Sequence, residues 1–315
     1  MKLTTASSPH IRGDFRTNRI MLDVVLALLP SLVVGILVMG SRALIVTGVS
    51  IAASLAAEFL YHVVTKSRNT LSDGSALVTG LLLAMTLPST VPYWLVVVGS
   101  VFAIVMVKAL CGGLGENIFN PALSARAFMM LIYPVGMVRY FVPGVDGVTA
   151  ATPLHHMVMP ALPQEGLWDM FLGRCSGSLG EISSAALLLG GAYLIYRKVI
   201  SLRIPVAYLG TVAVLTLLFP KTENAVQWMA YSLFSGGLML GAIFMATDYA
   251  SSPVTPVAQI IYGIGCGILT VLFRYYGLYP EGVTYAILMM NGFVWILDRY
   301  TAPRRFGKQK GGAVS

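Results

Sequence analysis

The sequence predicts an all-α integral membrane protein with about ten transmembrane helices. Of its 315 residues, 57% are hydrophobic and only 11% are charged, and the mean hydropathy is +0.78. A soluble domain carries roughly 25% charged residues, so one globule could not hide this much apolar surface from water. Apolar runs long enough, or nearly long enough, to cross a bilayer recur ten times. The first 19 residues are polar and basic, and we expect no cleavable signal peptide there.

The ten runs define the expected helices in chain order. They cover residues 20–39, 43–64, 75–88, 93–110, 121–138, 183–199, 204–220, 227–246, 255–273 and 283–298. The third, fifth and eighth runs are short or interrupted by glycine, which indicates broken or irregular helices. A membrane tolerates such helices only where protein or a cavity shields the backbone.

The distribution of Lys and Arg orients the chain. With ten spans and both termini in the cytoplasm, 16 of the 21 basic residues fall on the cytoplasmic side, as the positive-inside rule requires. This bias explains the net charge of +8 without a nucleic-acid partner. The single membrane domain then divides into a first five-helix half (1–138), an extracytoplasmic loop (139–182), a second five-helix half (183–300) and a basic cytoplasmic tail (301–315).

Two segments of the chain echo each other. "LVTGLLLAMTLPSTVP" at 77–92 resembles "LMLGAIFMATDYASSPVTP" at 238–256. They lie in the third and eighth runs, five helices apart, and an odd offset places the two copies in opposite orientations. We therefore expect two inverted five-helix repeats, with a site near the membrane midplane where the short helices meet. The alternative is a chance similarity between two helices rich in small residues, which pack well in any bundle.

Two amides open the fifth run, in "GENIFNPALSARAF" at 115–128. On one interpretation, Pro121 starts a half-helix and Asn120 caps it. On the other, Asn117 and Asn120, three residues apart, lie on one face and hydrogen-bond a flat heterocycle. We expect Arg126 to hold a carboxylate such as Glu116.

A polar stretch, "DGVTAATPLHHM" at 146–157, follows the fifth run. A hydroxyl on such an exposed segment can enter the active site of a modifying enzyme, and Pro153 keeps Thr152 out of helical geometry. The alternative is an Asx or Ser/Thr turn after a span. The paired His155 and His156 either bind metal or shuttle protons, or are simply solvated.

Acidic residues inside or beside the spans are candidates for function, because a charge in a membrane is costly. They are Asp23, Glu58, Asp73, Asp248 and Asp298. For Asp23 and Glu58, an ion pathway and a buried ion pair stay equally open.

Two of these carboxylates invite a more specific expectation. Asp248 stands beside Ser251 and Ser252 at a break in the repeated segment, and such oxygens suit a hard cation such as Na⁺. The alternative for Asp248 is a salt bridge at a helix end. We expect Asp298 to form such a bridge with Arg299. The cysteines (Cys111, Cys175 and Cys266) are scattered without a CxxC pair, so we expect no zinc site or Fe–S cluster held by this chain alone.

Three motifs carry a resemblance to a known family. "SPHIR" at 8–12, "GENIFNPALSARAF" and "DGVTAATPL" at 146–154 resemble the NqrB/RnfD family of membrane redox subunits, over nearly the whole chain. The resemblance implies a covalent FMN, joined as a phosphodiester to Thr152 by a flavin transferase. The attachment pattern reads Asp146, Thr149, Ala150, Ala151 and Thr152, with Ala150 in place of the usual glycine.

The resemblance further implies a non-covalent riboflavin beside Asn117 and Asn120 on the cytoplasmic side. It also implies a complex in the bacterial cytoplasmic membrane that couples ferredoxin–NAD electron transfer to Na⁺ or H⁺ export. Partner subunits would carry the Fe–S clusters, further flavin and the NAD site. The ion-pathway candidates are then Asp248, Asp23, Glu58 and Glu116. The rival function is a solute channel of the urea or ammonium type, which also has ten helices in inverted halves but needs neither the tether nor the transferase.

Overall fold

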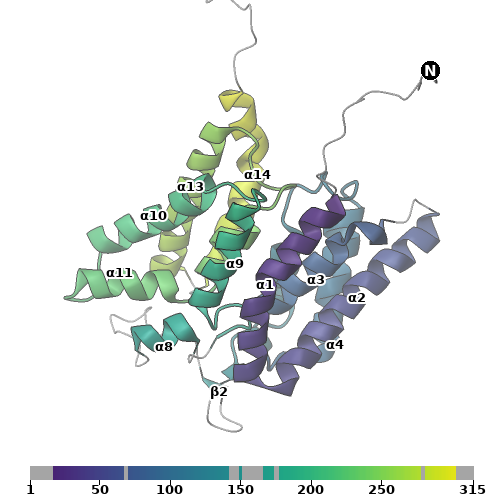
Figure 1. The fold of residues 1–315 in the computed structure, drawn as a ribbon, viewed down its shortest axis with the longest axis horizontal. Helices are drawn as coiled ribbons and strands as arrows, with labels where there is room; N and C mark the ends of the chain where they lie inside the picture. Colours follow the sequence, from purple (N-terminus) through teal and green to yellow (C-terminus); the bar gives the residue numbers. More distant parts are fainter. Residues whose placement is uncertain are drawn as a thin grey trace, which may run out of the picture.

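The computed structural model describes residues 17–66, 70–141, 149–150, 166–173, 177–277 and 281–302, which are almost entirely helical (Figure 1). The first half contains α1 (Thr17–Met39), α2 (Ser41–Thr65), α3 (Ser75–Thr86), α4 (Tyr93–Val101), its π-helical continuation η2 (Phe102–Ala109) and α5 (Pro121–Ile132). The second half contains α9 (Ser184–Tyr196), α10 (Arg203–Leu218), α11 (Ala225–Phe234), α12 (Leu238–Leu240), its π-helical continuation η3 (Gly241–Met245), α13 (Pro256–Tyr276) and α14 (Val283–Thr301).

Short elements join these helices. They are the 3-10 turn η1 (Leu71–Asp73), α6 (Pro134–Met137), α8 (Leu167–Leu172) and the strands β1 (Tyr140–Phe141) and β2 (Thr149–Ala150). The strands pair antiparallel, with Tyr140 opposite Ala150 and Phe141 opposite Thr149. β2 lies at the end of the molecule opposite the start of α1 (Figure 1).

The apolar, all-helical character predicted from the sequence is confirmed. Among the described helices, α1, α2 and α13 are long and apolar enough to cross a membrane singly, and α11 with α12–η3 forms a further apolar pair bent by 65°. The shorter apolar helices are α3, α4–η2, α5, α9 and α10. Many large apolar side chains on these helices are exposed, Leu37 and Val64 by 78% each, and apolar surface of this kind is suited to lipid or to partner subunits rather than to water.

The packing of the helices follows the same scheme in both halves. In the first half α2 packs on α3 and α4, and in the second α10 packs on α11 and α13. The last helix of each half packs on the one before it, α5 on α4–η2 and α14 on α13. Between the halves α1 contacts α9, and α5 contacts α14. Each of these two contacts joins helices that hold the same position in their own half.

One segment of the expected extracytoplasmic loop is not a surface loop. Residues 177–184 are all buried. The backbone N–H of Leu179 donates to Leu87 O (3.2 Å), and that of Gly180 donates to Met85 O (2.7 Å). A Cβ on Gly180 would lie 2.9 Å from Met85 O and 2.7 Å from a Leu240 side-chain carbon, so only glycine permits this approach. The segment therefore enters the bundle and satisfies carbonyls at the end of α3.

Candidate functional site

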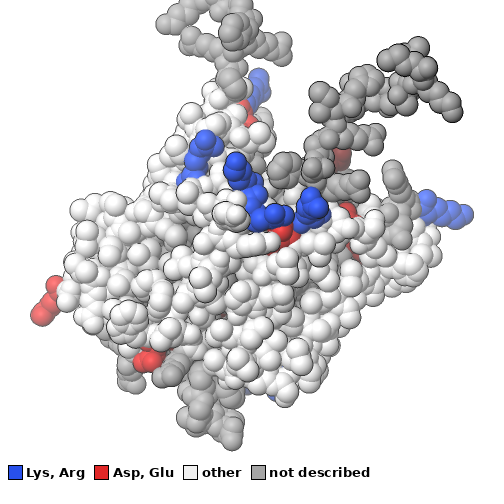
Figure 2. Space-filling view, viewed as in Figure 1, with Lys and Arg blue, Asp and Glu red and all other residues white. Residues whose placement is uncertain are grey.

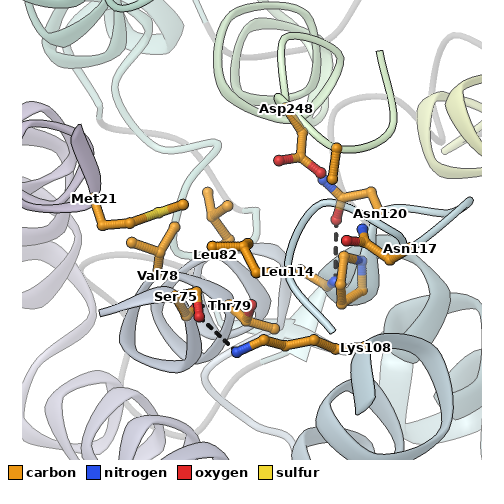
Figure 3. A pocket seen from close by; sticks show the side chains of 13 residues that line it. Met21, Ser75, Val78, Thr79, Leu82, Lys108, Leu114, Asn117, Asn120 and Asp248 are labelled. Atoms are coloured by element: carbon orange, nitrogen blue, oxygen red, sulfur yellow. Dashed lines mark hydrogen bonds between the residues drawn. The ribbon is translucent and has the colours of Figure 1, made fainter. Parts of the chain in front are cut away.

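Two small polar cavities lie at opposite ends of the short helices. The first, the Lys108 cavity, has a volume of about 50 Å³ and is bordered by Met21 near the start of α1. Its polar lining residues are Ser75, Thr79, Lys108, Asn117, Asn120 and Asp248 (Figure 3). The second, the Arg274 cavity, has a volume of about 10 Å³. Its polar lining residues are Thr86, Arg126, Glu181, Arg274, Glu281 and Thr284. A cavity needs at least roughly 10–15 Å³ to hold one water, so the first has room for a few waters or an ion.

A buried ion pair forms one wall of the Lys108 cavity. The Lys108 ammonium donates to Glu58 Oε1 (2.5 Å) and to Ser75 Oγ (2.6 Å), and both charged side chains are about 95% buried. Glu58 Oε2 is buried and has no hydrogen-bond partner among the described residues. Of the two roles left open for Glu58, the structure shows the buried pair.

The Lys108 pair continues into a chain of hydrogen bonds on each side. Thr70 Oγ1 donates to Glu58 Oε1 (2.9 Å), and His62 Nε2 lies 2.8 Å from Thr70 Oγ1. On the other side, Asp73 accepts from the backbone N–H and the hydroxyl of Ser75 at 2.8 and 2.5 Å. Asp73 therefore stabilises the first turn of α3, and the chain links His62 to the start of that helix.

The two amides of the fifth run line the same cavity, but they do not act alike. Asn120 Oδ1 accepts from the backbone N–H groups of Ala122 (3.1 Å) and Leu123 (3.2 Å), which confirms the helix-cap interpretation. Its Nδ2 donates to Met245 O at the end of η3 (3.4 Å). Asn117 Nδ2 donates to Phe119 O (3.1 Å). Both the oxygen and the nitrogen of the Asn120 amide are thus hydrogen-bonded within the protein, whereas only the nitrogen of Asn117 is, so Asn117 has more capacity left to bind a ligand.

Asp248 completes the Lys108 cavity from the second half of the chain. It follows η3, and its Oδ2 accepts from Ser251 Oγ (3.0 Å). Figure 3 shows it on the same side of the cavity as Asn120, across from Ser75. None of the three ion pairs among the described residues includes Asp248. The salt bridge considered for it is not seen, and its carboxylate lies at the wall of a polar cavity instead.

The Arg274 cavity holds a second set of buried charges. The Arg274 guanidinium, at the end of α13, donates to Ser232 O (2.5 Å) and Ser235 O (2.9 Å) at the end of α11. Its Nε and Glu181 Oε1 are buried without hydrogen-bond partners in the described part of the chain. Buried charged groups with unused hydrogen-bonding capacity, facing a cavity, call for water or an ion.

The expected pair of Arg126 with Glu116 is wrong. Arg126, in the middle of α5, forms a buried ion pair with Glu281, which precedes α14. The Tyr140 hydroxyl also donates to Glu281, and burial raises the pKa of Tyr140 so that the phenol keeps its proton. Glu116 is exposed, in the turn before α5. The α5–α14 contact brings Glu281 to Arg126, whereas Glu116 lies beyond the start of α5 and outside the bundle.

Two other carboxylates have structural roles. Asp23 accepts from Tyr193 Oη (2.8 Å) and from the Arg197 guanidinium (3.2 Å), so a buried carboxylate and an exposed guanidinium join α1 to the end of α9. The salt bridge expected between Asp298 and Arg299 is not formed. Asp298 instead accepts from the backbone N–H groups of Val254 and Thr255 (3.1 Å each), at the start of α13. Free N–H groups at a helix start attract a carboxylate for the same reason that an N-cap does.

Most of the remaining candidates fall outside the residues that the structure describes. Asp146, Thr152, His155 and His156 lie outside them. Thr149 belongs to β2, whose backbone is paired with β1.

The sequence interpretation missed Lys108, Arg274, Glu181, Glu281 and Tyr140. Lys108 and Arg274 were counted as charges of the flanking loops, yet both are at least 94% buried. The available signal was their position, since each ends the fourth apolar run of its half. Glu181 and Glu281 each precede an apolar run by a few residues, a pattern that also fits an ordinary loop.

Comparison with known proteins gives a consistent result over the whole chain. A sequence model described as the NQR2, RnfD, RnfE family matches residues 4–307. The chain is 47% identical to the D subunit of the Na⁺-translocating ferredoxin:NAD⁺ oxidoreductase complex of Acetobacterium woodii, over 98% of this chain and 97% of that protein. It is 43% identical to the proton-translocating counterpart of Clostridium ljungdahlii, with the same coverage. It is 33% identical to the D subunit of the ion-translocating oxidoreductase complex of Escherichia coli, over 99% of this chain and 100% of that protein.

Proposed function

Because the chain belongs to the NQR2, RnfD, RnfE family, we propose that it is the flavin-carrying membrane subunit of an ion-translocating ferredoxin:NAD⁺ oxidoreductase complex. The named activity of its relatives, over almost their full length, carries this proposal. The chain is a part of a translocase and has no complete active site alone. Other subunits of the complex are its partners and supply the Fe–S clusters, further flavin and the NAD site. Flavins carry the electrons, and this chain orients and insulates them.

The charge distribution supports a location in the bacterial cytoplasmic membrane with both termini in the cytoplasm. Figure 2 shows Lys and Arg gathered at the end of the molecule from which α1 starts, where the positive-inside rule places the cytoplasm. β2 lies at the opposite end (Figure 1). This arrangement supports an extracytoplasmic position for the flavinylation motif.

The helix packing supports ten spans in two inverted five-helix repeats. The contacts of α1 with α9 and of α5 with α14 join counterparts, as a pseudo-two-fold axis would. Lys108 and Arg274 end corresponding helices of the two halves and border cavities at opposite ends. In the second half the bent unit α11–α12–η3 takes the place of the short helix α3.

The two cavities together form the proposed ion pathway. On α5, Ala122 lines the Lys108 cavity and the next residue, Leu123, lines the Arg274 cavity. The two cavities therefore approach each other at the start of α5, where both lining residues are apolar. Asp248 is the proposed cation ligand on the Lys108 side, because it is the carboxylate that lines this cavity and no ion pair among the described residues includes it. Glu58 and Asp23 are held in ion pairs, and Glu116 is exposed in the turn before α5 and does not line the cavity.

Replacing Asp248 by asparagine is expected to weaken binding of the coupling cation about tenfold or more, which corresponds to about 1.4 kcal/mol. The amide keeps the size of the side chain and removes the charge. The measurement is the cation concentration that half-saturates ferredoxin-dependent NADH formation in membrane vesicles. The matched control is Asp298→Asn, which removes a carboxylate that caps α13 instead. Equal effects of the two substitutions would contradict the role of Asp248.

The covalent flavin is proposed to be FMN, joined through its phosphate to the Thr152 hydroxyl by a flavin transferase. The motif residues Thr149 and Ala150 are held by β1 at the end of the molecule, away from the packed helices, and a modifying enzyme needs this kind of access. The bound FMN would accept and donate electrons one or two at a time. The chain's own contribution is to fix the attachment point next to the end of the bundle that holds the Arg274 cavity.

Riboflavin at Asn117 and Asn120 is also proposed, but the Lys108 cavity does not fit it in this conformation. The cavity has a volume of about 50 Å³, whereas pockets for organic ligands span roughly 300–1,000 Å³. Binding would require the cavity to open toward the cytoplasm, with Asn117 as the available amide. The test is the non-covalent flavin released by denaturing the purified complex, and Asn117→Leu should remove one riboflavin per complex. An unchanged riboflavin content would overturn this site.

Vesicles test the function as a whole. Inverted membrane vesicles that contain the full complex should form NADH from reduced ferredoxin and NAD⁺ while they take up Na⁺ or H⁺. Vesicles from a strain that lacks this subunit should do neither until the gene is restored. Coupled NADH formation without the subunit would overturn the proposal. The solute-channel alternative is not supported by any comparison, and it predicts urea or ammonium flux without electron transfer.

A further inference from the structure

A long groove separates α9 from α10 on the outer surface of the second half. The two helices diverge from the turn that joins them, since α9 packs on α1 and α8 while α10 packs on α13 and α11 (Figure 1). The cavity between them has a volume of about 550 Å³, and none of its lining residues has a polar side chain. Leu233 and Ile243 line it from other elements, and four of the lining residues on α9 and α10 are small: Gly191, Ala192, Gly210 and Ala213.

A second cavity of about 500 Å³ adjoins the groove at the cytoplasmic end of α9. Ile195 and Ile200 line both cavities, so the two are immediate neighbours. Unlike the groove, the second cavity has polar side chains in its lining. They are Lys198, Ser201, Thr247, Tyr249, Ser252 and Gln259. None of its lining residues is acidic.

The basic side chain that lines this cavity, Lys198, forms no ion pair among the described residues. Of the basic residues near the turn, Arg197 pairs with Asp23 (3.2 Å), and Arg203 donates to Gln259 Oε1 (3.4 Å). Lys198 is exposed, and no ion pair between described residues includes it. Its backbone is left-handed, with φ of 57°, a conformation that is uncommon for residues other than glycine and marks this turn as a constrained one.

We propose that the groove and the Lys198 cavity together bind one anionic phospholipid, with its acyl chain between α9 and α10 and its phosphate at Lys198. The apolar part lies along two membrane helices, and the cationic part lies at the level where the headgroups of the cytoplasmic leaflet begin. The Ser252 hydroxyl makes no hydrogen bond among the described residues, and Gln259 Nε2 uses one of its two hydrogens on Pro253 O (3.1 Å), so these two groups beside Lys198 supply hydrogen-bond donors for phosphate oxygens. A helix of a partner subunit would fill the apolar groove but would leave the Lys198 cavity without an anion. This inference goes beyond the proposed redox function and does not depend on the flavins.

Two substitutions test the two parts of the site, and each has a matched control. Gly210→Leu fills the groove without a clash, because a Cβ at Gly210 would meet no described atom within 4 Å. Gly48, on exposed α2, has the same open surroundings and lines none of the four cavities, so Gly48→Leu is its control. Lys198→Gln removes the cation. Lys66→Gln is its control, because Lys66 is also exposed and left-handed (φ 51°) at the cytoplasmic end of α2 and lines none of these cavities.

The experiment uses the complete purified complex, depleted of lipid in a neutral detergent. It is titrated with dioleoyl phosphatidylglycerol, dioleoyl phosphatidylcholine or inorganic phosphate, and native mass spectrometry counts the adducts retained on this subunit. We expect one phosphatidylglycerol, bound at least tenfold more weakly after Lys198→Gln or Gly210→Leu and unchanged in both controls. The thermal unfolding midpoints of the variants, measured in parallel, should match wild type.

Several outcomes would overturn the proposal. Equal retention of phosphatidylcholine would show that the charge has no part in binding. Retention of inorganic phosphate with the affinity of the lipid would show that the groove has none. Unchanged phosphatidylglycerol binding in either test variant would place the lipid elsewhere. A photo-crosslinker at position 210 that captures another subunit of the complex would show that a protein helix occupies the groove.

Discussion

Replacement of Thr152 by valine is expected to abolish the ultraviolet fluorescence of the denatured subunit in an electrophoresis gel. A phosphodiester survives denaturation, so a covalently bound flavin migrates with the polypeptide and remains fluorescent, whereas a dissociable flavin is lost. Valine has nearly the shape of threonine but lacks the hydroxyl that would form the ester. The measurement is the in-gel band of the subunit, produced together with its flavin transferase, and the intact mass should fall by one FMN unit.

The matched control for this experiment is Thr152→Ser, which retains a hydroxyl and should retain a band. Ala150→Gly restores the residue usual in the attachment pattern and should give a band at least as strong as that of wild type. A band that persists in Thr152→Val would show that the flavin is attached elsewhere. A wild-type subunit without any band or added mass would remove the covalent flavin from the proposed function.

Replacement of Lys108 by methionine is expected to lower the free energy of unfolding by about 3–5 kcal/mol. The substitution leaves Glu58 buried without its cation, and breaking a buried pair by removing one partner has a cost of this size. Replacing both partners, in Glu58→Gln with Lys108→Met, should recover most of the loss because no unpaired charge then remains. The measurement is the denaturant or thermal unfolding of the purified subunit in detergent.

The control for the Lys108 substitution is Arg19→Met, which removes a cation from an exposed position in the first turn of α1. A surface substitution of this kind usually changes stability by no more than about 0.5 kcal/mol. If the single variant Lys108→Met were as stable as wild type, the ion pair would not be a fixed part of the folded structure. If the double variant were no more stable than the single one, the loss would come from packing rather than from the charge on Glu58.

The sequence predicted the helices better than it predicted their partners. Each apolar run is a local property, because about 20 apolar residues in succession have few alternatives to a helix in a membrane. The start of α5 was equally readable, since Asn120 before Pro121 is a local capping signal. Asp248 could also be singled out from the sequence, because it is an acidic residue at a break in an apolar run, and it does line a polar cavity.

The ion pairs were not predictable in the same way. Arg126 and Glu281 are 155 positions apart in the chain, and Arg197 and Asp23 are 174 apart. Spacing along one helix identifies neighbours three or four residues away and says nothing about a helix from the other half. The nearby Glu116 was therefore the only acid that local reasoning could offer Arg126. The burial of residues 177–184 was hidden for a related reason, because a short stretch rich in glycine and serine also describes an ordinary loop.

That buried stretch has a mechanical consequence. The backbone hydrogen bonds of Leu179 and Gly180 to Leu87 and Met85, with no space for a side chain at Gly180, couple residues 177–184 rigidly to the carboxyl end of α3. α3 begins at Ser75, which lines the Lys108 cavity, and ends at Thr86, which lines the Arg274 cavity, so this helix runs from one cavity to the other. If residues 177–184 move, either α3 moves with them or the two backbone hydrogen bonds break. A force on residues 177–184 is therefore transmitted along α3 to Ser75 and, through its hydroxyl, to Lys108.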